Sequence, residues 1–210
     1  MEMAMFPLGA VLMPGETLAL KVFEPRYAAM IDDLLTAERD PEFGVVLIAR
    51  GHEVGGGDVR TDIGVTARVT EVIDLPGRQF RIRAVGGERF RVLRWLPDDP
   101  YPRAEIEWWP DGVGGDDSAL LAGLRERLTT VRSLTTELTR KAGIRRTPPT
   151  PDLDKLPADP SARSFAVADR LPIGAADRHD ALAAPDPLVR LQGLTDALDD
   201  VIATLRFRLL

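Results

Sequence analysis

The stretch FEPRYAAMIDDLL, residues 23–35, marks the point where a short strand gives way to a helix. Pro25 stands in the first turn of that helix, where a missing backbone N–H does no harm. The apolar residues that follow have helical spacing: Tyr27, Met30, Ile31, Leu34 and Leu35. We expect Phe23, Tyr27 and these helical positions to close one end of a β-rich core.

Two charged residues flank Pro25 at this corner. Glu24 precedes the helix, where its carboxylate can interact with free backbone N–H groups, and Arg26 follows. One interpretation is that the motif builds the strand-to-helix corner. The alternative is a direct role for Glu24, Arg26 or Tyr27 in binding.

Short apolar runs separated by glycine and proline fill the rest of residues 1–110, a texture that is typical of a β-rich domain. Strands are expected at Met3–Phe6, Leu18–Phe23, Phe43–Ala49, from Ile63 onward and at Arg103–Trp109. The glycine-rich segment His52–Asp62 is expected to be a mobile loop. Six or so strands with one early helix predict a small closed or half-closed barrel.

A hairpin is expected where two glycines interrupt an alternating pattern. We favour a three-residue turn at Gly86–Glu88, because it pairs the apolar residues of the inner face: Ala84 with Phe90 and Ile82 with Val92. A two-residue turn at Gly86-Gly87 would mix the two faces.

The outer face of this expected hairpin is rich in arginine. Six arginines fall within residues 78–94 against the single acid Glu88: Arg78, Arg81, Arg83, Arg89, Arg91 and Arg94. In the favoured register Arg83 lies opposite Arg91, which is mildly destabilising unless anions lie nearby. One interpretation is that Glu105 and Glu107, on the next strand, interleave with the arginines. The alternative is a binding patch for an acidic peptide segment or RNA.

The second half of the chain has a helical texture. Leucine and valine recur at three- and four-residue spacing over Ser118–Ala142, which predicts one long helix, capped by Asp116 or Asp117 and ended by Gly143. The proline-rich stretch Ile144–Pro160 is expected to be extended. Further helices are expected from a cap at Ser161 to about Arg170, at Gly174–Leu182 and at Pro187–Phe207. Together they predict a small helical bundle.

The composition excludes several functions. The chain has no cysteine, which excludes disulfides, thiolate metal sites and a cysteine nucleophile. The net charge of −6 arises entirely within residues 1–112, and an acidic surface makes nucleic acid an unexpected partner. No apolar run is long enough to span a membrane, and the first residues lack the pattern of a signal peptide. A cytoplasmic protein without membrane contact is expected.

No constellation of catalytic or metal-binding residues is visible. His52 and His179 are not spaced as metal ligands, and no Gly-Lys-Ser or Gly-Lys-Thr of a phosphate-binding loop occurs. Ser118 and Lys141 could suggest a serine–lysine pair, but they would lie roughly 35 Å apart along one helix. We therefore expect no catalytic residue, no metal and no cofactor.

The chain also carries an ordered series of short motifs. The first group comprises Phe6-Pro7-Leu8-Gly9, Val11-Leu12, Pro14-Gly15, Leu20 and Phe23-Glu24-Pro25-Arg26-Tyr27. The second comprises Phe43–Ile48, Ile63–Ala67, Gly86–Val92 and Asp169-Arg170-Leu171-Pro172. This series resembles the Lon-protease N-terminal (substrate-binding) domain family and spans almost the whole chain.

The resemblance implies a fold and a role. The fold is α+β, with a PUA-like β-barrel and one inserted helix over residues 1–112 and a helical bundle over residues 113–210, including the proline-rich connection at 144–160. It implies a stand-alone, non-catalytic member, without ATPase and peptidase domains, that binds unfolded or extended polypeptides or a partner protein as an adaptor in protein quality control. The candidate binding residues are Glu24, Arg26, Tyr27, Arg83 and Arg91. RNA binding through the Arg78–Arg94 segment is the alternative function.

Overall fold

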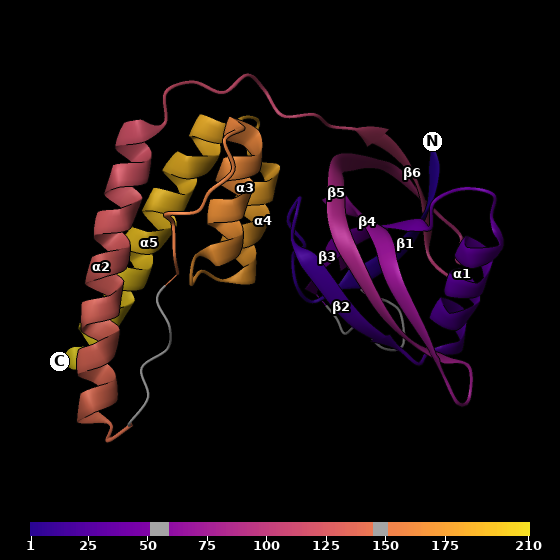
Figure 1. Cartoon of the computed structure of the whole chain (residues 1–210), viewed down its shortest axis with the longest axis horizontal. Coiled ribbons are helices and arrows are strands. Elements are labelled where there is room, and N and C mark those ends of the chain that lie inside the picture. Colours follow the sequence, from indigo (N-terminus) through magenta and orange to yellow (C-terminus); the bar gives the residue numbers. More distant parts are fainter. Residues whose placement is uncertain (51–58, 145–150) are drawn as a thin grey trace. The chain divides into compact units, whose positions relative to one another are not determined.

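The computed structural model describes residues 1–50, 59–144 and 151–210, which fall into two compact units (Figure 1). The first unit is Met1–Pro110 and the second is Asp111–Leu210, so the division lies close to the boundary expected after residue 112. Strands and one helix build the first unit, and four helices build the described part of the second. The chain is therefore an α+β protein.

The first unit contains one mixed sheet. Its six strands are β1 (Glu2–Leu8), β2 (Thr17–Val22), β3 (Glu42–Arg50), β4 (Val59–Leu75), β5 (Gln79–Leu96) and β6 (Arg103–Trp108). The strand order is β2-β5-β4-β3-β1-β6, and β5 also pairs with β6. Strands β5, β4, β3, β1 and β6 thus form a closed ring, with β2 attached to β5. Only the β1–β3 pairing is parallel among those described.

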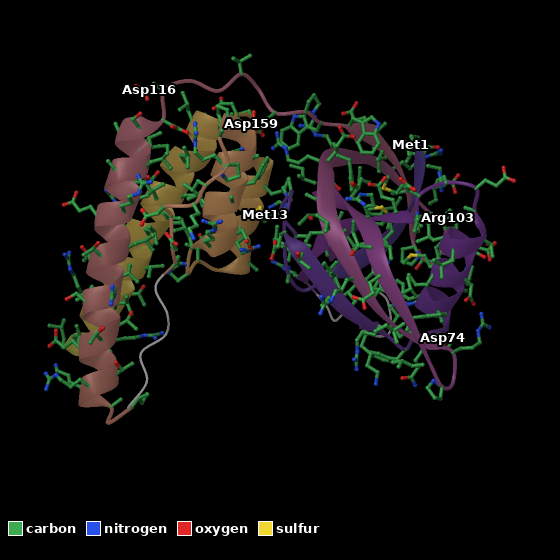
Figure 2. All side chains as sticks on the ribbon, viewed as in Figure 1. Met1, Met13, Asp74, Arg103, Asp116 and Asp159 are labelled. Atoms are coloured by element: carbon green, nitrogen blue, oxygen red, sulfur yellow. The ribbon has the colours of Figure 1, made fainter. Side chains whose placement is uncertain are left out.

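Apolar side chains fill the interior of the ring (Figure 2). The central cluster comes from four strands and consists of Met3, Met5, Val46, Phe90, Val92, Ala104 and Ile106. Helix α1 (Pro25–Thr36) follows β2 and begins at Pro25, as predicted. It buries the face that carries Tyr27, Met30, Ile31 and Leu34. The helical spacing of these residues therefore indicates the packed face correctly, except for Leu35, which is exposed.

The predicted hairpin turn at Gly86–Glu88 is wrong. Strand β5 runs through these residues without a break, and the turn between β4 and β5 lies at residues 76–78, where Gly77 and Arg78 have positive φ. The predicted partners are therefore not paired: Ala84 lies opposite Leu18 and Val69, while Phe90 lies opposite Gly64 and Trp108.

Gly86 marks the place where β5 changes its neighbour. Before it, β5 pairs with β2 from Phe80 to Val85, and after it β5 pairs with β6 from Phe90 to Leu96. A Cβ atom on Gly86 would lie 2.1 Å from the carbonyl oxygen of Met13. Gly86 is thus required by close packing of two backbone segments rather than by a turn.

The expected loop at His52–Asp62 is only partly described. Residues 51–58, which include His52 and the three glycines, lie outside the described residues. The rest of the segment, Val59–Asp62, is the beginning of strand β4, so this part of the prediction is wrong. Here β4 pairs with the end of β3, where Ile48 lies opposite Arg60.

The helical unit follows the sequence pattern closely. Its helices are α2 (Ser118–Lys141), α3 (Pro160–Arg170), α4 (Ala175–Ala183) and α5 (Pro187–Leu209). Helices α2 and α5 run side by side in the same direction (Figure 1), and Lys141 Nζ at the end of α2 donates to the carbonyl oxygen of Leu209, 2.9 Å away, at the end of α5. Gly143, with φ of 68°, follows the last turn of α2.

The helix caps differ in part from those predicted. Asp159, labelled in Figure 2, caps α3 by accepting from the backbone N–H of Ala162 at 2.8 Å, so the predicted cap at Ser161 is wrong. The Ser161 hydroxyl instead donates to Asp111. At the start of α2, Asp116 accepts from both the backbone N–H and the hydroxyl of Ser118. Of the expected connection Ile144–Pro160, residues 145–150 lie outside the described part.

Candidate functional site

The corner after β2 holds a charged pair. Arg26 Nε donates to Glu24 Oε2 at 3.1 Å, and both side chains are about four-fifths buried. Glu24 makes no capping hydrogen bond to the helix, so its expected interaction with free backbone N–H groups is not found. The carboxylate fixes the arginine instead.

Tyr27 is part of the core, whereas Phe23 is not. The Tyr27 ring stacks on Phe6, with 4.0 Å between the ring centroids. The Cζ atom of Arg26 lies 4.5 Å from the centroid of the Tyr27 ring. Tyr27 is 3% exposed and Phe23 is 54% exposed. The prediction that Tyr27 closes the core is confirmed, and the same prediction for Phe23 is wrong because its ring faces solvent.

Sequence reasoning missed three residues that complete this corner. Asp98 Oδ2 lies 4.0 Å from Arg26 Nη1 and 3.7 Å from Arg60 Nη2, and the Arg60 guanidinium lies over the ring of Trp95. These residues come from the start of β4, the end of β5 and the loop after it. Arg60 and Trp95 lie on the paired strands β4 and β5, and Asp98 follows β5. No local pattern connects these three residues with Arg26, because they are distant from it in sequence.

The arginines of β5 have acidic neighbours. Arg91 lies 3.8 Å from Glu107, and Arg94 Nη2 donates to Glu105 Oε1 at 2.5 Å, which confirms the interleaving predicted for the next strand. The hydrogen bond from Arg94 holds the pKa of Glu105 below its ordinary value. Arg83 lies 3.4 Å from Glu71 on β4, and it is not opposite Arg91. The structure therefore separates the two candidate residues Arg83 and Arg91.

Strand β2 has one open edge. It pairs with β5 from Thr17 to Val22, and no segment among the described residues pairs with its other side. Thr17, Ala19 and Lys21 are exposed along it, and the strand leads directly to the exposed ring of Phe23. The open edge and the corner are thus continuous along the chain, and they can contact another polypeptide through backbone and apolar groups.

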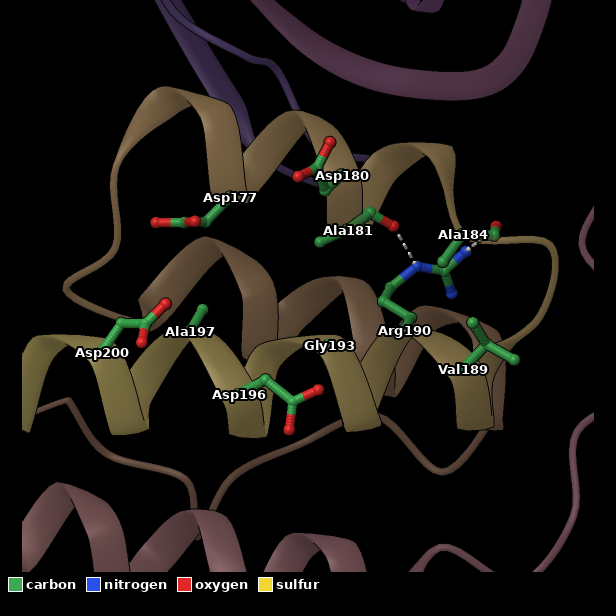
Figure 3. Close-up of a pocket in the computed structure, with 10 residues that line it drawn as sticks. All are labelled: Asp177, Asp180, Ala181, Ala184, Val189, Arg190, Gly193, Asp196, Ala197 and Asp200. Carbon is green, nitrogen blue, oxygen red and sulfur yellow. Dashed lines mark hydrogen bonds between the residues drawn. The ribbon is translucent and has the colours of Figure 1, made fainter.

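The helical unit contains an acidic cleft of about 310 Å³ between α4 and α5 (Figure 3). Four carboxylates surround it: Asp177, Asp180, Asp196 and Asp200. Over the described ranges, none of them forms a salt bridge with arginine or lysine. Sequence reasoning missed this cleft, although the spacing of three and four residues within each pair places both members on one helix face.

The serine–lysine pair considered from the sequence does not form. Ser118 and Lys141 are the first and last residues of α2, so they cannot meet. His179 lies on α4, and His52 is outside the described residues. In the part of the chain that the structure describes, no three metal-ligating side chains converge, and no helix is long and apolar enough to cross a membrane.

The sequence matches one protein-family model and parts of longer relatives. Residues 2–200 match the model of the ATP-dependent protease La (LON) substrate-binding domain. The chain is 31% identical to Lon protease 2 of Sorangium cellulosum over 87% of its length and 25% identical to Lon protease 1 of Herpetosiphon aurantiacus over 94%. These regions are only 22% and 24% of the two relatives, so the chain spans less than a quarter of their length.

Solved structures show the same fold. The crystal structure of a Lon N-terminal domain protein from Xanthomonas campestris has a TM-score of 0.64 at 25% identity, covering 92% of this chain and 96% of that one. The N-terminal domain of a Mycobacterium avium complex Lon protease has a TM-score of 0.59 at 17% identity, covering 95% and 99%. The second likeness concerns the fold alone.

Proposed function

Because this chain belongs to the ATP-dependent protease La (LON) substrate-binding domain family, we propose that it is a non-catalytic module that binds unfolded or extended segments of other proteins. The observation that carries the proposal is the family match over residues 2–200, which extends over most of both units. We further propose that the module acts as a substrate-recognition adaptor in protein quality control, and that its five-stranded ring is a PUA-like barrel.

The geometry of the first unit supports polypeptide binding. The open edge of β2 offers backbone hydrogen-bonding groups, and Phe23 offers an exposed aromatic ring at the end of that edge. Glu24 and Arg26 hold each other in place, with the Arg26 guanidinium over the Tyr27 ring, and Tyr27 anchors the corner in the core. Of the candidate residues, Glu24 and Arg26 thus position the surface, and Tyr27 supports it from below.

RNA binding through the arginines of β5 has less support. Arg83, Arg91 and Arg94 each lie within 4 Å of a glutamate, which offsets the positive charge of these three arginines. A nucleic-acid site gains its affinity from cations that are available to phosphates. The acidic partners favour the interpretation of these arginines as parts of the sheet surface.

A titration with an unfolded protein tests the proposal. A reduced and alkylated protein that cannot refold is labelled with a fluorophore, and its anisotropy is followed as the full chain is added. We expect saturable binding in the micromolar range, and no binding of the same labelled protein in its native, disulfide-intact form. If several unfolded proteins cause no change in anisotropy, the proposal is wrong. Retardation of mixed RNA in an electrophoretic shift assay at low salt would favour RNA binding instead.

A further inference from the structure

The outer edge of β2 carries backbone groups with which no described segment pairs. In an antiparallel pair every second residue directs both its N–H and its C=O away from the partner strand. Since no other described segment pairs with β2, these groups form a row of free donors and acceptors. Such an edge is a ready template for another extended strand. In contrast, four strands of the ring are each paired with a neighbouring strand along both edges: β4, β3, β1 and β6.

An uncompensated pair of like charges lies beside this edge. Lys21 on β2 lies directly opposite Arg81 on β5, and both side chains are exposed. Like charges at opposed positions destabilise a sheet. On its other side, Arg81 lies opposite Ile73 of β4, which carries no charge. Within the described ranges, neither Lys21 nor Arg81 has a carboxylate within salt-bridge distance.

The neighbouring arginines show the contrast. Arg83, two residues after Arg81 on the same face of β5, lies near Glu71. Arg78, at the turn between β4 and β5, forms a salt bridge with Asp32. Each of these cations has an anion supplied by this chain. Lys21 instead lies on the open-edge strand itself, where the side chain opposite it on an added strand would be its neighbour, and Arg81 lies on the strand behind it.

We propose that the outer edge of β2 accepts an extended segment of a bound polypeptide as an added β-strand, with an acidic side chain of that segment opposite Lys21. This inference rests on the proposed function and names its substrate class. The acidic residue neutralises Lys21 directly and relieves its repulsion of Arg81. On the other face, Leu18 and Leu20 are half-buried, so they favour apolar residues at the alternate positions of the segment.

Charge-reversed peptides test the side-chain part of the inference. A short peptide that alternates valine with glutamate is compared with the same peptide carrying lysine for glutamate, both titrated into the full chain by fluorescence anisotropy. We expect the glutamate peptide to bind about threefold or more tightly. Lys21→Glu should reverse the preference, whereas Lys155→Glu, the same charge change at an exposed position of the helical unit, should leave it unchanged. An equal affinity for both peptides overturns the inference.

Backbone methylation of the peptide tests the strand addition without altering the protein. Two versions of the glutamate peptide are made. In one, the backbone nitrogens of the odd-numbered residues are methylated, and in the other those of the even-numbered residues. Each version thus loses the backbone N–H donors along one of its two edges. One peptide should lose binding and the other should keep it, because only one edge meets β2. If both bind like the unmodified peptide, no strand is added and the inference fails.

The result can be separated from the fate of the proposed function. If unfolded proteins bind saturably but show no dependence on Lys21 or on backbone methylation, the inference fails and the proposed function stands. If neither peptides nor unfolded proteins bind, the proposed function fails as well. RNA retardation that Lys21→Glu abolishes, in the absence of peptide binding, would instead assign this edge to nucleic acid and overturn the inference.

Discussion

Arg190 and Asp111, 79 residues apart in sequence, form a bidentate ion pair inside the helical unit, with 2.6 Å between Arg190 Nη2 and Asp111 Oδ1 and 2.8 Å between Nη1 and Oδ2. The remaining donors of the fully buried guanidinium go to Ser164 Oγ and to the carbonyl oxygens of Ala181 and Ala184. All five donors are thus used. The guanidinium also lies over the Phe165 ring, and the network joins α3, α4 and α5.

Removing the carboxylate from this pair should destabilise the helical unit strongly. Asp111→Ala leaves Arg190 as a buried charge without a counter-ion, and we expect a loss of about 3–5 kcal/mol in the free energy of unfolding. Urea unfolding followed by circular dichroism at a helix-sensitive wavelength measures it. Asp199→Ala, which breaks the exposed pair with Arg127, is the matched control and should change stability little. Equal effects of the two variants would contradict a role for burial.

Two glycine-to-alanine substitutions should act in opposite directions. Gly86→Ala places a Cβ atom 2.1 Å from a backbone oxygen, and we expect a loss of about 1–3 kcal/mol or more. Gly193→Ala lies within α5 where nothing is within 4 Å of the new atom, and it should gain about 0.5–1 kcal/mol from helix propensity. Thermal unfolding compares both with the parent. A neutral Gly86→Ala would mean that β5 and Met13 can separate at no cost.

The Arg94–Glu105 pair should produce a pH dependence of defined sign. Its hydrogen bond lowers the pKa of Glu105 below the ordinary value of 4.5 in the folded state. The pair's contribution is therefore complete above that value and is lost as pH falls through the lowered pKa. Arg94→Gln should move the pKa of Glu105 upward, as measured by carboxyl-carbon NMR titration. An unchanged pKa in this variant would show that another group holds the glutamate ionised.

Phe23 and Tyr27 should separate binding from stability. Tyr27→Ala removes a buried ring that stacks on Phe6, and it should cost about 3–5 kcal/mol of stability. Phe23→Ala removes an exposed ring and should change stability by less than about 0.5 kcal/mol. Under the proposed function, it should nevertheless weaken the binding of unfolded polypeptide. Chemical unfolding and anisotropy titrations on the same two variants give both readouts, and the opposite ranking would reject this division of roles.

Local signals predicted those features that depend on local chemistry. The start of α1 at Pro25 follows from the fixed φ of proline, and the end of α2 before Gly143 follows from the ability of glycine to adopt a positive φ. The pairing of Arg91 and Arg94 with β6 also followed from alternation along two strands. The true β4–β5 turn had a local signal as well, because Pro76-Gly77 is a common turn dipeptide.

Contacts between distant segments could not be predicted in the same way. Gly86-Gly87 looks like a turn, but its glycines are required by the approach of Met13, which no local pattern records. Arg190 looks like an ordinary charged residue within an apolar helix face, and its partner lies in the segment that enters the helical unit. The corner around Arg26 likewise joins residues that are distant in sequence, since Asp98 lies near both Arg26 and Arg60.

The buried Arg190–Asp111 pair also determines where the chain can be divided for separate expression of its halves. A fragment starting at residue 113 would contain α2, α3, α4 and α5 and yet lack the anion that neutralises Arg190. Two further residues at its amino terminus would restore that anion. The first residues of the second unit, which precede its first helix and look like dispensable linker, are thus a folding determinant of that unit.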